Sequence, residues 1–142
     1  MSKFQILCVT MHQNDFSKIN QMNLHSDVIF ANQTNETSYK EYKFEGHIAK
    51  MLSTNTRGVG INRNISLMLA DSEICLFADD DMIYEDDLEE QVINEFTQHP
   101  DADIIIFNVK TSDDTIRKQK VYEKTRKCSR WEKMPWGGSD CF

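Results

Sequence analysis

The chain has 142 residues, of which 39% are hydrophobic and 27% are charged, and its formal net charge is −7. This length and composition support one globular domain and exclude general disorder. The excess of acidic residues excludes a general affinity for nucleic acid or anionic membranes, because both bind to positive protein surfaces.

The apolar segments are too short for a membrane protein. None approaches the roughly 20 residues that a bilayer-spanning helix needs, and no signal peptide precedes the first apolar run. We therefore expect no transmembrane segment and a cytoplasmic location, with room for peripheral contact with the inner face of the membrane.

Apolar runs and helical spacing alternate along the chain. Buried strands are predicted at residues 4–11, 27–31, 74–77 and 104–107. Helices are predicted over residues 61–69 and 86–98, while residues 14–23 fit a helix or a loop and residues 41–51 a short strand or a helix end. This alternation predicts an α/β fold with a mostly parallel sheet and helices on both faces. Ligands of such sheets bind beyond the carboxyl ends of the strands.

The charges are unevenly distributed. Between Arg63 and Lys110 there is no Lys or Arg, whereas residues 110–133 are strongly basic. The basic segment is interpreted either as a solvated tail or helix face, or as a flap over an anionic ligand.

Three consecutive carboxylates, Asp79, Asp80 and Asp81, follow the apolar run at residues 74–77. Like charges at the mouth of a buried strand repel one another and are costly to desolvate, which favours a bound cation. Because side chains alternate along a strand, Asp79 and Asp81 are predicted to point the same way and Asp80 the opposite way. Mg²⁺ and Mn²⁺ prefer carboxylate oxygens, so Asp79 and Asp81 are the predicted metal ligands. The alternative is an exposed acidic turn ahead of the next helix.

The second motif is Arg-Gly-Val-Gly-Ile-Asn-Arg-Asn at residues 57–64. The chain contains no P-loop and no complete dinucleotide fingerprint. At a helix N-terminus, Arg63 is suited to a phosphate and Asn64 to a hydroxyl group or a base edge. The alternative is a helix arginine packed against a neighbouring acid.

Together, residues 56–64 and 70–81 resemble the family 2 glycosyltransferases of the GT-A fold. Members of that family show a Gly-rich approach, an Arg-Asn pair opening a helix, and an apolar strand ending in Asp-x-Asp. The resemblance covers about residues 4–109 and implies a GT-A, Rossmann-like fold. It also implies a nucleotide-diphospho-sugar donor of the UDP type, held by Asp79 and Asp81 through Mn²⁺ or Mg²⁺. The sugar would pass, with inversion, to a hydroxyl group of a saccharide or another acceptor.

The resemblance also implies donor-binding residues. It places Thr10, at the end of the first strand, and Asn32 or Gln33, at the end of the second, in the nucleoside pocket. Many members carry an acidic residue near that second position, so the amides leave base recognition open. The expected nucleotide-sugar-binding residues are Thr10, Asn32, Gln33, Arg57, Arg63, Asn64 and Asp80.

We expect residues 1–110 to form the nucleotide-sugar-binding core, and residues 111–142 to be a basic, irregular remnant of the acceptor-side region. Family members carry a catalytic base on a later segment, often in a Gly-Glu-Asp-like sequence. Asp140, after Gly137 and Gly138, resembles that sequence faintly and is the candidate base; the base is otherwise unassigned.

The chain is therefore expected to be a shortened glycosyltransferase whose transfer activity is open. Two alternatives stay open beside it. One is a non-catalytic binding or assembly domain derived from a glycosyltransferase. The other is a haloacid-dehalogenase-like phosphohydrolase with Asp79 as its nucleophile.

Overall fold

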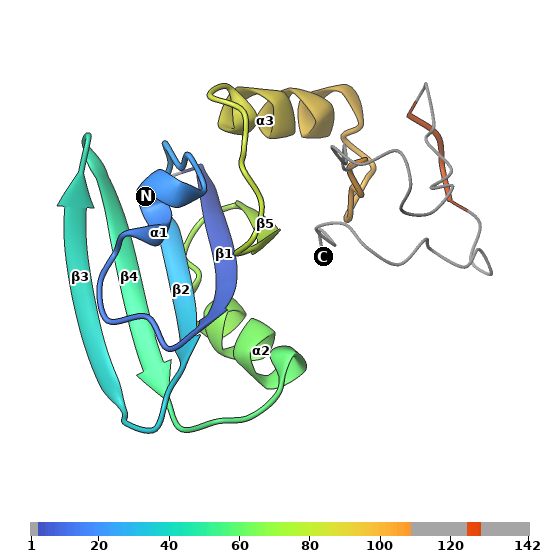
Figure 1. The fold of residues 1–142 in the computed structure, drawn as a ribbon. Helices are drawn as coiled ribbons and strands as arrows, with labels where there is room; N and C mark the ends of the chain where they lie inside the picture. Colours follow the sequence, from blue (N-terminus) through green and yellow to red (C-terminus); the bar gives the residue numbers. More distant parts are fainter. Residues whose placement is uncertain (1–2, 109–124, 129–142) are drawn as a thin grey trace, which may run out of the picture.

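The computed structural model describes residues 3–108 and 125–128, and every structural statement below concerns this part of the chain. It contains five strands and three helices (Figure 1). In chain order they are β1 (Phe4–Met11), α1 (Lys18–Gln21), β2 (Val28–Gln33), β3 (Ser38–Phe44), β4 (His47–Thr54), α2 (Val59–Leu69), β5 (Ile74–Asp79) and α3 (Leu88–Gln98).

The strands form one sheet in the order β3-β4-β2-β1-β5. β1 pairs in parallel with β2 and with β5, and β2 pairs in parallel with β4. β3 runs antiparallel to β4 at one edge. The predicted α/β fold with a mostly parallel sheet is therefore confirmed.

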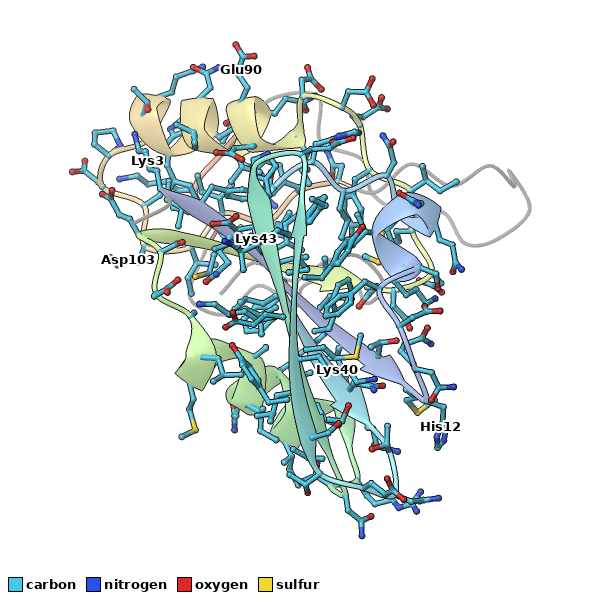
Figure 2. The ribbon with its side chains drawn as sticks, turned by 90° about the vertical axis from the view of Figure 1, so that its left-hand side faces the viewer. Lys3, His12, Lys40, Lys43, Glu90 and Asp103 are labelled. Atoms are coloured by element: carbon cyan, nitrogen blue, oxygen red, sulfur yellow. The ribbon has the colours of Figure 1, made fainter. Side chains whose placement is uncertain are left out.

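Helices cover both faces of the sheet, because its central strands are apolar on both sides. On one face Phe4, Ile6 and Cys8 of β1 pack with Ile19 of α1 and Val92 of α3. On the other face Leu7 of β1, Ile29 of β2 and Phe77 of β5 pack against Leu69, at the end of α2. Figure 2 looks onto the β3 edge and shows α1 and α2 on opposite sides of the hairpin that carries Lys40 and Lys43. These two apolar layers explain why β1 is a nearly continuous apolar run.

The sequence pattern did not predict the β3–β4 hairpin. Its turn is Glu45–Gly46, and both residues have a positive φ, of 47° and 88°, as tight two-residue hairpin turns require. Residues 38–43 of β3 are all exposed, so this edge strand has no apolar run to mark it. Residues 41–51 are therefore the end of one strand and the start of the next.

The strand predicted at residues 104–107 is not formed. Ile105 is buried, but Ile104 and Ile106 are 51% and 42% exposed, and the segment is not paired with the sheet. An apolar run becomes a strand only where a neighbouring strand takes up its backbone hydrogen bonds, and here β5 is the edge on that side.

Candidate functional site

The polar residues predicted to bind a ligand lie at one edge of the sheet, where four parallel strands end. In the sheet register Thr10 of β1 lies beside Asn32 of β2, and Asn32 lies beside Ser53 of β4. On the other side, Val9 lies beside Asp79, the last residue of β5. The sheet therefore brings the ends of the first, second and third predicted strands together, as ligand sites in parallel sheets require.

Asp80 is held on the β1 side of this edge. Its Oδ2 accepts a hydrogen bond of 2.6 Å from the Thr10 hydroxyl. Lys18 of α1 donates a hydrogen bond of 2.9 Å to the Asp80 carbonyl oxygen, and its Nζ lies 3.6 Å from Asp80 Oδ2. The side chain of Asp80 thus points toward β1 and α1, where its charge is partly balanced.

Asp79 turns toward α2. Its Oδ1 lies 3.6 Å from Nη2 of Arg63, and the Arg63 guanidinium lies over the ring of Phe77, 5.9 Å from the centroid. Asp79 and Asp80 therefore contact different elements, Asp79 the helix α2 and Asp80 the strand β1 and the helix α1. α2 begins at Val59, so Arg63 lies in its second turn and reaches the site sideways rather than from the helix N-terminus.

Asp81 lies beyond the strand. β5 ends at Asp79, and Asp81 is an exposed turn residue. The predicted common direction of Asp79 and Asp81 assumed a strand through residue 81, which the backbone does not continue. Within residues 3–108 and 125–128, no three His, Cys, Asp or Glu side chains are grouped closely enough to hold a metal ion by themselves.

The amide of Asn32 is used inside the protein. Its side chain is fully buried. Its Oδ1 accepts a hydrogen bond from the Gln13 backbone N–H (3.0 Å), and its Nδ2 donates to the Gln13 carbonyl (2.8 Å) and to the Ser53 hydroxyl (2.9 Å). Asn32 thereby holds the loop that follows β1 against the sheet edge. Contact between this amide and a nucleoside stays a prediction, and it would require Gln13 to move.

Gln33 ties the end of β2 to the start of α2. Its Oε1 accepts hydrogen bonds from the Gly58 N–H (3.2 Å) and from Asn62 Nδ2 (3.4 Å). Gly58 has a φ of 113°, which explains why glycine stands at this entry turn. The other two predicted donor-binding residues lie outward: Arg57 is exposed and donates a long hydrogen bond of 3.5 Å to Asn35, and Asn64 is exposed on α2.

Burial and negative charge disfavour further anions near the triplet. Burial, aided by the neighbouring Asp80 charge, raises the pKa of the Cys8 thiol. Burial also raises the pKa of Tyr84, whose hydroxyl donates to the Asp79 carbonyl at 3.4 Å. Both groups therefore stay neutral near pH 7, and Cys8 is a free, buried thiol. The negative charge of this edge lies on the three aspartates, of which Asp79 lies beside Arg63 and Asp80 beside Lys18.

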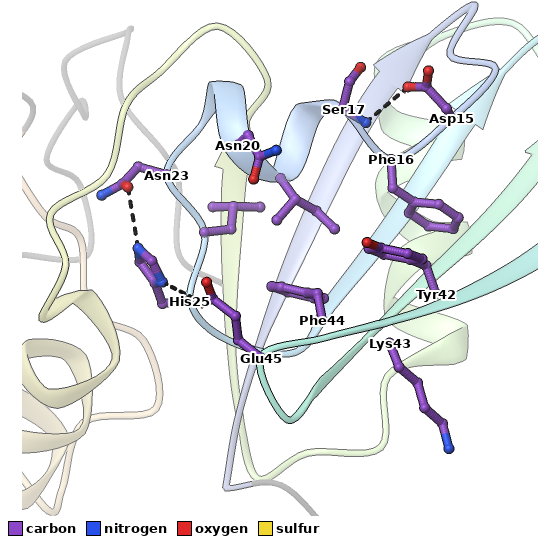
Figure 3. Close-up of a pocket in the computed structure, with 12 residues that line it drawn as sticks. Asp15, Phe16, Ser17, Asn20, Asn23, His25, Tyr42, Lys43, Phe44 and Glu45 are labelled. Atoms are coloured by element: carbon purple, nitrogen blue, oxygen red, sulfur yellow. Dashed lines mark hydrogen bonds and ion pairs between the residues drawn. The ribbon is translucent and has the colours of Figure 1, made fainter.

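A separate hollow of about 860 Å³ lies between α1 and the β3–β4 hairpin (Figure 3). A row of rings lines it, with the centroids of Phe16 and Tyr42 5.4 Å apart and those of Tyr42 and Phe44 6.4 Å apart. His25 contacts Asn23 and Glu45 at its rim. None of the predicted site residues lines this hollow.

Two residues with clear roles at the edge were missed by sequence reasoning. Lys18 stands in the polar segment at residues 14–23, whose pattern favours neither helix nor loop. Asn62 is buried and accepts a hydrogen bond of 2.8 Å from Thr56, but it directly precedes the Arg63-Asn64 pair that drew the interpretation. The sequence did carry a signal for Asn62. It is a polar residue four positions after Gly58, and this spacing places it on the inner face of α2.

Asp140, the candidate base, lies outside the described residues. The described part contains no helix with the length and apolar character that a membrane crossing requires.

Comparison with known proteins gives one match. The family model described as Glycosyl transferase family 2 matches residues 19–140. That range includes the glycine motif, α2 and the three aspartates, and it begins after Thr10. No curated protein and no solved structure matches the chain.

Proposed function

Because the chain belongs to glycosyl transferase family 2, we propose that it binds a nucleotide-diphospho-sugar of the UDP type through a divalent cation at residues 79–81. The sugar is then transferred to a hydroxyl group of a saccharide or another acceptor, with inversion at the anomeric carbon. The observation that carries the proposal is the position of the three aspartates. They follow β5 at the edge where the parallel strands β1, β2 and β4 also end.

The side chains fit a hard cation that shares its ligands with a substrate. Asp79 is 43% exposed and Asp81 is exposed, so both carboxylates are open to a ligand from solvent. Mg²⁺ is usually bound by one or two carboxylates together with substrate phosphates, so a group of three protein ligands is not required. Asp79 and Asp81 would hold Mn²⁺ or Mg²⁺. When bound, the cation offsets the charge that the diphosphate gains as it leaves.

The other residues of the edge orient the aspartates and the donor. Thr10 and Lys18 hold Asp80, while Arg63 supplies a positive charge beside Asp79. Asn32 fixes the loop after β1, and Gln33 fixes the start of α2, so these two amides shape the nucleoside side of the edge. Their joint effect is to position the donor before the reaction begins.

The transfer itself needs an acceptor and a base. The acceptor oxygen forms a bond to the anomeric carbon, the bond from that carbon to the diphosphate oxygen breaks, and the base takes the hydroxyl proton. Asp140 stays the candidate base. Transfer by these 142 residues alone stays open, and a cytoplasmic location beside the membrane stays a prediction.

Calorimetry with UDP tests the proposal. We expect UDP to bind in the presence of Mn²⁺ and to lose most of its affinity when Mn²⁺ is removed by a chelator. The absence of nucleotide binding under both conditions would favour a non-catalytic assembly domain. Release of phosphate from an aryl phosphate, lost in Asp79→Asn, would instead favour the phosphohydrolase.

A further inference from the structure

Lys18 is a partly buried cation at the acidic edge whose role nothing in the sequence predicts. Its side chain is only 18% exposed, and its Nζ contacts both the carbonyl oxygen and Oδ2 of Asp80, at 2.9 Å and 3.6 Å. It belongs to α1, which lies directly after the loop that Asn32 holds.

The position of Lys18 is fixed by further bonds between α1 and the segment after the aspartates. Tyr84 donates its backbone N–H to the Met22 carbonyl at 3.0 Å. Asn23 donates to the Tyr84 carbonyl at 2.9 Å and to Asp86 Oδ1 at 2.7 Å. The backbone that follows Lys18 is thus tied to the segment after the aspartates by bonds that do not involve Asp80.

A fixed ammonium group here acts with opposite sign on the two components of the proposed ligand. It repels a divalent cation that arrives alone, and it attracts a diphosphate. Both effects are strengthened by burial, because a buried charge is screened less by water and salt than an exposed one.

We propose that Lys18 is a positioning residue that couples the two binding events: it weakens binding of the cation alone and strengthens binding of the nucleoside diphosphate with the cation. The inference rests on the proposed function and adds to it a reason why cation and donor bind together. By thermodynamic linkage, a group that weakens binding of the cation alone and strengthens binding of the cation with the diphosphate increases the coupling free energy between these two ligands.

Arg63 is less suited to this role. It lies 3.6 Å from Asp79, which is itself a proposed cation ligand, so replacing Arg63 also changes that ligand directly. Lys18 contacts Asp80, which is not a proposed cation ligand. Replacing Lys18 therefore changes the charge near the site without changing a cation ligand directly.

The test is Lys18→Gln, which removes the charge and keeps an amide that can donate to the Asp80 carbonyl. Binding of Mn²⁺ alone is followed by electron paramagnetic resonance of the free ion, and binding of UDP at saturating Mn²⁺ by calorimetry. We expect Mn²⁺ alone to bind about 3-fold more tightly and UDP with Mn²⁺ about 3- to 10-fold more weakly, as for one partly buried charge.

Two further variants serve as controls. Lys18→Arg keeps the charge and is expected to behave like the parent in both titrations. Lys50→Gln removes the same charge from a comparable pair, in which Nζ of Lys50 lies 3.1 Å from Asp71 Oδ2 and the Lys50 side chain is 22% exposed. It is expected to change neither affinity. If circular dichroism shows Lys18→Gln to be unfolded, Lys18→Met, which keeps the aliphatic stem, takes its place.

Opposite shifts of the two affinities support the inference. Weakening of both would mean that Lys18 only holds the turn, and unchanged affinities or a tightening of both would equally overturn it. A parent chain that fails to bind UDP with Mn²⁺ refutes the proposed function before any variant is measured, and the inference then falls with it.

Discussion

The carboxyl ends of β1 and β5 and the carboxyl ends of β2 and β4 lie at the same edge of the sheet, but they use their polar groups differently. At β2 and β4, the Asn32 amide is fully buried and bonded to Gln13 and Ser53. At β5, Asp79 and Asp81 keep exposed carboxylates whose charge is only partly balanced. The ends of β2 and β4 build the edge, whereas the end of β5 is where we propose that a ligand binds.

Asp81→Ala is expected to have the largest effect, with a strong loss of ligand binding and almost no change in stability. An exposed turn carboxylate contributes little packing, so the melting temperature should stay within about a degree or rise slightly as repulsion is removed. Binding of UDP with Mn²⁺ should fall by at least about 100-fold if a cation ligand is lost. Asp101→Ala removes the same charge from an exposed turn that follows α3 and should leave binding intact. Unchanged binding in Asp81→Ala would show that this carboxylate is not a ligand.

The opposite pattern is expected for Asn32→Ala. The change removes a fully buried amide and the partners of the Gln13 N–H, the Gln13 carbonyl and the Ser53 hydroxyl. The free energy of unfolding should therefore fall by about 2–3 kcal/mol. Urea denaturation measures this loss, and Asn64→Ala on the exposed face of α2 should change stability by less than about 0.5 kcal/mol. An Asn32→Ala variant with parental stability and weakened UDP binding would show instead that Asn32 serves ligand binding and not the stability of the edge.

Thr10→Val is expected to have an intermediate effect. It removes the hydroxyl that donates to Asp80 Oδ2 at 2.6 Å, but Asp80 is 34% exposed, so water can replace part of the bond. We expect a loss of about 1 kcal/mol in the free energy of unfolding, recovered in Thr10→Ser, as measured by urea denaturation of the three proteins. Equal losses in Thr10→Val and Thr10→Ser would assign the effect to packing instead.

The smallest effect is expected at the Lys50–Asp71 pair, which lies outside both regions. The hydrogen bond from Lys50 lowers the pKa of Asp71 below its ordinary value of 3.8. The folded state therefore gains stability from this carboxylate above the ordinary pKa, and loses it as the pH falls through the lowered pKa. Since Asp71 is 56% exposed, the gain is at most about 0.5 kcal/mol.

The stability difference between the parent and Lys50→Met should accordingly be present at pH 7 and vanish at strongly acidic pH. Denaturation curves at a series of pH values measure it. A difference that persists at the acidic end would be due to lost packing of the Lys50 stem and not to the ion pair.

Much of the fold followed from apolar patterning because the central strands are buried on two faces. Phe4–Met11 is the first strand as predicted, and residues 61–69 and 74–77 fall within α2 and β5. β3 was not separable because an exposed edge strand with charged residues has no apolar run. Residues 104–107 show the converse, since an apolar run does not specify whether a partner strand is present.

The site was predictable in position but not in detail. That Thr10, Asn32 and Asp79 end neighbouring strands follows from the parallel sheet. Which of these polar groups form hydrogen bonds within the protein does not follow from the sequence, because it depends on contacts between residues far apart in the chain. Lys18 and Asp80 are 62 positions apart, and Asn32 meets a loop residue, Gln13, that no pattern distinguishes.

We propose that a divalent cation at Asp79 and Asp81 binds the diphosphate of the donor. Anomalous diffraction from crystals soaked with Mn²⁺ and UDP can locate this cation. We expect an anomalous peak beside both carboxylates, with the diphosphate on its open side. A map without a peak at that turn, in crystals that contain bound UDP, would contradict it.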